Sequence, residues 1–470
     1  MRCVGLSFTV KALSTRARFG MGMASRLHLE KALTPAGWRT DLVATIEGGT
    51  IAALEPATDR DGIVERVAGV VLPGMPNLHS HAFQRAMAGL TESRGTEADS
   101  FWSWRETMYR FVERLRPDDL EAIAALAYME MLEAGFTSVA EFHYLHHQPD
   151  GRPYDNPAEM SERIVAAADA VGIGLTLLPV LYRQSGFLGK PATAGQRRFL
   201  NDPNSYARLM ETRVPGGTIG IAPHSLRAVT LEDLRWAATT WRDRPAHIHI
   251  GEQTREVEEC LAAHGQRPID LLLDTVDVGE RWCLVHATHA DSTERARLAG
   301  TRAVVGLCPI TEANLGDGLF DVPDFLSQGG RLGIGSDSLV RISAAEELRT
   351  LEYGQRLMHR RRNVLGEPSR STGRRLFELA LSGGAQATGR PIGALAAGAR
   401  ADFVVLDSNH PSFAAVRDDA VIDAFVFAAD NAAITTVYSG GVPVVREGRH
   451  VARDVIAARY RKTVSRLAAL

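Results

Sequence analysis

The chain has few cysteines and no long apolar run. Its four cysteines among 470 residues form no CxxC pair, which argues against a zinc ribbon, a dithiol redox motif and a disulfide framework. No segment reaches the run of about 20 apolar residues that a membrane-spanning helix requires. We therefore expect a soluble protein of the reducing cytoplasm.

A strong net charge is absent as well. The formal net charge is −3, and no basic patch suits nucleic acid or an anionic membrane surface. We expect neither of these as a partner and instead expect a small-molecule substrate. With 45% hydrophobic residues, a chain of this length can bury one large core and a second, smaller one.

The first 24 residues differ from the rest of the chain. They are rich in arginine, and no acidic residue precedes Glu30, a pattern that superficially suits a transit peptide. Translation from an upstream start, with Met21 or Met23 as the true beginning, is the interpretation that we favour. We therefore treat residues 1–24 as a non-native start or a disordered extension and exclude them from the fold.

Short apolar runs alternate with helical segments through the middle of the chain. One helical segment, 117–135, begins with a proline, carries acidic residues in its first turn and ends at a glycine. The alternation indicates repeated βα units around a parallel sheet. The expected strands lie within residues 70–81, 137–144, 174–183, 217–225, 245–252, 282–288, 303–309 and 331–337.

Eight such strands predict an α/β protein with a (β/α)8 barrel, which we assign to residues 73–392. An open doubly wound sheet is the alternative, although no GxGxxG follows the first strand. The flanking segments 25–72 and 393–460 contain short β-rich runs joined by Gly-Gly turns. Neither segment could bury a core alone, so we expect the two to pair as a small β-sandwich.

Two histidines mark the end of the first expected strand. His79 and His81, in "PNLHSH", are two residues apart and so face the same side of a strand. In a barrel they would project at the carboxyl-terminal mouth, where the catalytic groups of this fold collect. An HxH pair alone is weak evidence, because two ordinary histidines at a strand end give the same pattern.

Later strands end in further groups of the same kind. The fifth run, "HIHIGE", places His247 and His249 on one face with Glu252 just beyond, and the sixth and eighth runs end near His286 and Asp337. Burying such polar groups is costly unless they are paired or coordinated. Three histidines and an aspartate make a suitable ligand set for zinc. The convergence favours metal ligands, with His247 packed behind them.

These motifs resemble those of the amidohydrolase superfamily. The segments "LPGMPNLHSH", "HIGE", "VHAT", "GSD" and "GALAAGARADFVVLD" are similar to its mononuclear deaminase branch. The resemblance implies one bound metal, whose ligands it assigns as His79, His81, His249 and Asp337. It also implies that Glu252 and His286 handle protons and that Asp337 takes part in catalysis beside the metal.

The scarcity of lysine agrees with a single metal. By the same resemblance, the binuclear branch uses a carboxylated lysine, usually from strand four, to bridge two metals. The four lysines of this chain are Lys11, Lys31, Lys190 and Lys462, and none falls in the fourth run. We therefore expect one divalent ion, zinc in the first place, while iron and manganese stay open.

Further segments are similar to the amidohydrolases that remove ammonia from N-formimino-L-glutamate in histidine degradation. They are "HSHAFQRAMAGLTE", "FWSWRETMYRF", "EFHYLHH", "APHSLRAV" and "LCPITEANLGDGLF". Arginine suits this dianionic substrate because its planar fork binds carboxylates bidentately. The resemblance suggests a homodimer and assigns the substrate contacts to Gln84, Arg105, Tyr144, His224 and Arg227.

The chemistry that these residues predict is hydrolysis of an amidine. A water activated by the metal attacks the formimino carbon, and Asp337 and His286 orient it and help to deprotonate it. Glu252 carries the proton to the imino nitrogen. Ammonia then leaves, and N-formyl-L-glutamate remains.

Each assignment has an ordinary alternative. An arginine such as Arg105 could form a surface salt bridge, and Tyr144 could be a packed aromatic. The same metal site could deaminate a heterocycle such as guanine, although two arginines aimed at a neutral ring would be desolvated without partners. A noncatalytic relative that serves as an interaction protein should have lost metal ligands, and all four are present.

Overall fold

The computed structural model describes residues 25–58, 65–93 and 100–468, so the interpretation of residues 1–24 lies outside the described chain. All eight expected barrel strands are present and parallel, and the fourth is split into two very short pieces. Their bounds are β5 (Met75–Ser80), β6 (Phe136–His143), β7 (Gly174–Leu181), β8 (Thr218–Ile219), β9 (Ala222–Pro223), β10 (Ala246–Ile250), β11 (Trp282–His286), β12 (Val304–Leu307) and β13 (Arg331–Ile334).

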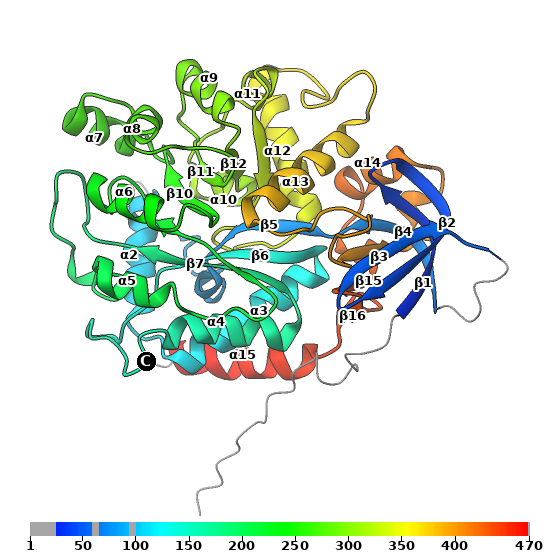
Figure 1. The fold of residues 1–470 in the computed structure, drawn as a ribbon, viewed down its shortest axis with the longest axis horizontal. Helices are drawn as coiled ribbons and strands as arrows, with labels where there is room; N and C mark the ends of the chain where they lie inside the picture. Colours follow the sequence, from blue (N-terminus) through cyan, green and yellow to red (C-terminus); the bar gives the residue numbers. More distant parts are fainter. Residues whose placement is uncertain (1–24, 59–64, 94–99, 469–470) are drawn as a thin grey trace, which may run out of the picture.

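Isolated parallel bridges join these strands into a closed barrel. The strands form two hydrogen-bonded groups, β5 to β8 and β10 to β13, with β9 paired to β7. Ile221 is bridged to Ala246, which joins the fourth strand to the fifth, and Ser80 is bridged to Asp337 beyond the eighth. Helices surround these strands (Figure 1). The (β/α)8 barrel is therefore confirmed, and the open doubly wound sheet is wrong.

The helix expected at 117–135 is α3 (Pro117–Glu133), with Pro117 in its first turn and Gly135 at a φ of +92° just beyond its end. A left-handed glycine there ends the helix and lets the chain turn into β6. The other helices from 101 to 388 are α2 (Phe101–Val112), α4 (Glu159–Val171), α5 (Pro203–Leu209), α6 (Leu231–Thr240), α7 (Thr254–His264), α8 (Pro268–Thr275), α9 (Ser292–Thr301), α10 (Pro309–Leu315), α11 (Val322–Ser327), α12 (Ala344–His359) and α13 (Thr372–Thr388).

The two chain ends build the separate β-sandwich that the sequence predicts. Its strands follow one hydrogen-bonded path, β17-β16-β15-β14-β4-β1-β2-β3, in which antiparallel pairing of β14 with β4 joins the ends. Figure 1 shows β1 to β4 beside β15 and β16 from the other end of the chain. Leu27, Ile51 and Phe403 belong to its own core. The strands are β1 (Ser25–Thr34), β2 (Gly37–Glu47), β3 (Thr50–Pro56), β4 (Glu65–Pro73), β14 (Phe403–Leu406), β15 (Ile434–Ser439), β16 (Val442–Arg446) and β17 (Arg449–His450).

Two helices near the end of the chain lie against the barrel. α14 (Asp419–Phe427) packs on α12 and α13, and α15 (Arg453–Ala468) packs on α3. Arg459 pairs with Glu121 of α3 at 2.6 Å, and Arg466 pairs with Asp119 of the same helix. The sandwich and the barrel are thus tied together by the tail as well as by the step from β4 into β5. In the described part of the chain, no helix is long and apolar enough to cross a membrane.

The contact between α13 and β13 requires a glycine and gives a first testable prediction. A Cβ on Gly383 would overlap the backbone carbonyl of Leu332, and backbone cannot rotate out of the way. We expect Gly383→Ala to lower the free energy of unfolding by about 1–3 kcal/mol, measured as a lower urea midpoint. The matched control is Gly300→Ala in α9, where nothing lies within 4 Å and a small stabilisation is expected. Equal midpoints for the two variants would contradict the close contact.

Candidate active site

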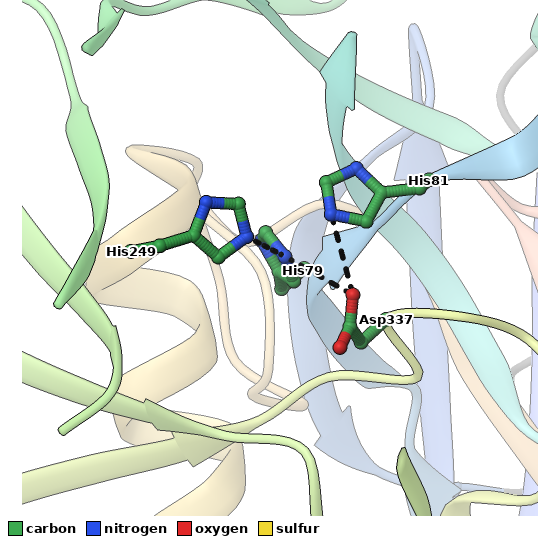
Figure 2. Close-up of side chains that lie close together, drawn as sticks. All are labelled: His79, His81, His249 and Asp337. Carbon is green, nitrogen blue, oxygen red and sulfur yellow. Dashed lines mark hydrogen bonds and ion pairs between the residues drawn. The ribbon is translucent and has the colours of Figure 1, made fainter. Parts of the chain in front are cut away.

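Four buried side chains converge at the carboxyl-terminal mouth of the barrel. His79 is the penultimate residue of β5, His81 follows the strand, His249 comes from β10, and Asp337 lies just beyond β13. Each offers one ligand atom, and these atoms lie within 4.8 Å of one another. Figure 2 shows the three rings and the carboxylate turned toward one another. Residues that are far apart in sequence therefore form one compact cluster.

The distances within the cluster leave little room for anything but a small ion. Asp337 Oδ1 lies 3.5 Å from His79 Nε2 and 3.3 Å from His81 Nε2. The Nε2 atoms of His79 and His249 are 3.0 Å apart. If both of these nitrogens carry lone pairs, they repel each other at this distance. A cation bound by both would remove that repulsion.

Hydrogen bonds outside the cluster aim the ring nitrogens. His81 Nδ1 lies 2.9 Å from the carbonyl oxygen of Phe142, and His249 Nδ1 lies 3.0 Å from that of His224. A carbonyl only accepts, so Nδ1 carries the proton in both rings and Nε2 presents its lone pair to the cluster. Burial also lowers the pKa of His79 to about 3 and lowers those of His81 and His249. Neutral imidazoles and one carboxylate are a donor set that fits a divalent metal.

Glu252 and His286 lie beside this cluster. His286 ends β11, and its Nε2 is 3.8 Å from both Glu252 Oε1 and Asp337 Oδ2. Burial raises the pKa of Glu252 above its usual range. Burial lowers the pKa of His286, but the carboxylates of Glu252, Glu312 and Asp337 outweigh it and raise that pKa to about 10. The pair can therefore exchange a proton next to the ligand cluster.

The pocket in front of the cluster is lined by all five residues that the resemblance assigned to the substrate. Aromatic side chains supply most of the remaining lining, together with three of the four cluster residues. The lining comprises His81, Gln84, Phe101, Trp104, Arg105, Met108, Tyr109, Tyr144, Tyr182, Phe199, His224, Arg227, His249, Glu252, His286, Leu315 and Asp337. The structure brings the assigned residues together, and their individual roles stay predictions.

The two arginines are held in the pocket by an aromatic ring. Arg105 lies on helix α2, where its guanidinium carbon is 4.5 Å from the ring centroid of Trp102, and that of Arg227 is 5.7 Å from the same ring. Arg227 is buried, and its Nε is 3.7 Å from Glu256 Oε2. Among the described residues Arg105 makes no ion pair, and the Nε atoms of both arginines lack a hydrogen-bond partner. Arg105 therefore has no competing carboxylate among the described residues, whereas Arg227 already faces Glu256.

The remaining assigned residues are also oriented by neighbours. Gln84 Nε2 donates to the hydroxyl of Tyr144 at 2.8 Å, while Gln84 Oε1 has no partner among the described residues. His224 follows β9, and its Nδ1 lies 3.1 Å from Ser225 Oγ. His247 faces away from the cluster, with its Nε2 2.8 Å from the carbonyl oxygen of Ala387. The pocket thus keeps one free amide oxygen next to Tyr144.

Sequence reasoning missed several residues of this site. Glu256 holds Arg227, Trp102 stacks on both arginines, and Glu312 contacts His286. Tyr109 and Tyr182 complete the pocket wall. Trp102 and Glu312 stand inside the segments "FWSWRETMYRF" and "LCPITEANLGDGLF", which was the one signal that could have marked them.

A (β/α)8 barrel with an imidazole and carboxylate cluster and an acid–base pair at its mouth is the arrangement of a metal-dependent hydrolase. The sequence model of the amidohydrolase family matches residues 70–444. The chain therefore belongs to the amidohydrolase family, as its motifs suggested.

Individual relatives agree with this assignment. The chain is 52% identical to formimidoylglutamate deiminase of Pseudomonas aeruginosa over 94% of its own length and 99% of the relative's. It is 50% identical to an amidohydrolase from Brucella melitensis of known crystal structure, with a TM-score of 0.91 over 94% of this chain and 100% of that one. A 5-methylthioadenosine/S-adenosylhomocysteine deaminase of Halobacterium salinarum is 26% identical, over 89% and 91% of the two chains.

Proposed function

We propose that this protein hydrolyses N-formimino-L-glutamate to N-formyl-L-glutamate and ammonia, a deimination step of histidine degradation. The observation that carries the proposal is the pocket, in which Arg105 and Arg227 lie with the metal-ligand cluster and Glu252. Both guanidinium groups line the pocket and suit the two carboxylates of this substrate, and Arg227 also faces Glu256. The extensive identity to a formimidoylglutamate deiminase supports the same reaction.

The residues at the mouth have complementary tasks in this reaction. The arginines bind the carboxylates, and the free Oε1 of Gln84 accepts a hydrogen bond from the formimino N–H. Glu252 takes a proton from the attacking water and returns it to the formimino nitrogen, so that the C–N bond breaks and ammonia leaves. His286, beside Glu252, stabilises the negative charge that develops on the oxygen.

The cluster of His79, His81, His249 and Asp337 would hold one divalent metal, which we propose to be zinc. Three neutral imidazoles and one carboxylate match the nitrogen and oxygen ligands that zinc takes in catalytic sites. When bound, the metal would supply Lewis-acid activation of the attacking water.

A purine deaminase is the competing function, because more distant relatives act on adenosine derivatives by name. The two arginines count against it. A flat neutral heterocycle offers no carboxylate, so Arg105 would lose water without gaining a partner, and Arg227 would keep only Glu256. An acyclic acidic substrate therefore fits the pocket better.

Ammonia release by the metal-loaded protein tests the proposal directly. N-formimino-L-glutamate should be turned over at ordinary enzyme rates, while guanine, cytosine and N-formimino-L-aspartate should give little or no ammonia. Activity on a ring substrate alone would agree with the proposed metal site but would contradict the proposed acidic substrate.

Replacement of the buried Arg227 is expected to slow the hydrolysis of N-formimino-L-glutamate. Arg227→Met should lower kcat/KM for N-formimino-L-glutamate. The loss of transition-state stabilisation should be about 3 kcal/mol, the cost of leaving a buried charge unpaired. The matched control is Arg255→Met, because Arg255 stacks on the same Trp102 ring at 4.5 Å but pairs with Glu259 outside the pocket. Unchanged kcat and KM in Arg227→Met would remove this arginine from the site.

The cellular setting forms part of the proposal. Cys260, Cys283 and Cys308 are free and buried, as expected for a protein of the reducing cytoplasm. A homodimer stays a prediction, which light scattering of the purified protein would test.

A further inference from the structure

Glu312 makes a buried contact with the proton-handling histidine from a separate element. It lies on α10, and its Oε1 is 3.1 Å from His286 Nδ1 and 2.8 Å from the backbone nitrogen of Cys308. Both Glu312 and His286 are buried. The other ring nitrogen of His286 faces Glu252 and Asp337. One imidazole thus connects a carboxylate behind the pocket with the groups in it.

We propose that Glu312 is the positioning residue of His286, which it holds with Nδ1 protonated and Nε2 directed at the reacting groups. The proposal deepens the hydrolysis proposed above and rests on it. A carboxylate oxygen that already accepts the N–H of Cys308 acts as an acceptor toward the ring. It therefore holds the proton on Nδ1 and fixes the rotation of the imidazole, as a carboxylate does for histidine in other hydrolases.

The backbone explains why His286 needs such a support. His286 and Ala287 have φ values of +69° and +51°, a region that non-glycine residues adopt only when their surroundings impose it. The strand ends at this residue, although the Ala287 N–H still donates to the carbonyl oxygen of Ile250. The contact with Glu312 restrains the ring through Nδ1, the nitrogen that does not face Glu252 and Asp337.

Two other roles for Glu312 have to be separated from positioning. It could serve only to anchor the start of α10, through the Cys308 N–H. It could also belong to a second metal site, because His286, Cys308 and Glu312 offer ligand atoms within 4.8 Å of one another. A second ion there would displace both hydrogen bonds of Oε1, which makes this use of the cluster unfavourable.

Glu347 provides the matched control for the anchoring role. It is fully buried, and its Oε2 accepts the backbone N–H of Ile310 at 2.9 Å, at the same helix start but without a contact to His286. Glu347→Gln and Glu312→Gln therefore alter comparable supports of α10. Only the Glu312 variants remove the restraint on the imidazole.

The kinetic test compares Glu312→Ala, Glu312→Gln and Glu347→Gln in the metal-loaded enzyme. We expect kcat of Glu312→Ala to fall by at least about 100-fold, the contribution of a positioned acid–base group, with KM changed by less than about threefold. Glu312→Gln keeps an acceptor oxygen but not the charge, so its kcat should fall less, by about tenfold. Glu347→Gln should keep the kcat of the wild type. A Glu312→Ala enzyme that retains wild-type kcat, or loses activity only through KM, would overturn the proposal.

Two readouts do not depend on turnover. In protein labelled with ¹⁵N-histidine, the His286 resonances, assigned by their absence in His286→Asn, should show a protonated Nδ1 that Glu312→Gln retains and Glu312→Ala loses. Metal content should be the same in the wild type and in both Glu312 variants. An unprotonated Nδ1 in the wild type, or the loss of one metal per chain in Glu312→Ala, would refute positioning. If the wild type instead releases no ammonia from N-formimino-L-glutamate while these two readouts hold, the proposed substrate fails and the positioning role stands.

Discussion

Glu252→Gln is expected to abolish turnover while the protein keeps its full metal content. The side chain is buried beside His286 and lines the pocket, but it is not one of the four clustered ligands. Glutamine preserves shape and hydrogen bonding but cannot take a proton from water and return it to the formimino nitrogen. Positioned acid–base groups contribute about 10²–10⁴-fold to the rate, so kcat should fall by at least about 100-fold. Ammonia release and elemental analysis of the same sample measure the two quantities.

The matched control for this change is Glu258→Gln. Glu258 lies on α7, close in sequence to Glu252, and is exposed rather than buried in the pocket. Its replacement should leave both rate and metal content unchanged. A Glu252→Gln enzyme with a near-normal rate would refute the proton-transfer role, whereas loss of metal would place Glu252 among the ligands.

His249→Ala should lose metal and activity together. His249 Nε2 points into the cluster, 3.0 Å from His79 Nε2, and its Nδ1 is engaged by the carbonyl of His224. Alanine removes one of only three nitrogen donors, and a divalent ion held by the remaining three groups would bind far more weakly. Metal per chain after gel filtration and ammonia release should both fall to background. A variant that keeps a full complement of metal would show that the ion is held elsewhere.

A second histidine on the same strand serves as the control. His247 belongs to β10 as His249 does, but its Nε2 hydrogen-bonds to the carbonyl of Ala387 and not to the cluster. Glutamine can donate to the same carbonyl. His247→Gln should therefore bind metal and release ammonia much as the wild type does. Equal losses in both variants would indicate general disruption of the strand rather than removal of a ligand.

The sequence determined the barrel and the metal cluster because both follow from local pattern. The spacing of His79 and His81 on one strand face is set by the pleat, and the closure of parallel strands brings every strand end to one mouth. Closure of the strands predicts that His249 and Asp337 lie at the same mouth as these histidines, and the resemblance assigned all four as ligands, which the structure brings within 4.8 Å of one another. Resemblance of short motifs added Gln84 and Arg227, which the structure indeed places in one pocket.

Tertiary structure alone decided how these groups are supported. Arg227 is held by Glu256, and His286 is held by Glu312. The contacts of Arg227 and His286 join different segments, and no periodicity specifies which side chains meet when loops and helices fold across the mouth. A strand pattern fixes the direction of a side chain relative to its own sheet. Its partners depend on the packing of the whole barrel, which is why the sequence predicted the reacting groups and only the structure identified what orients them.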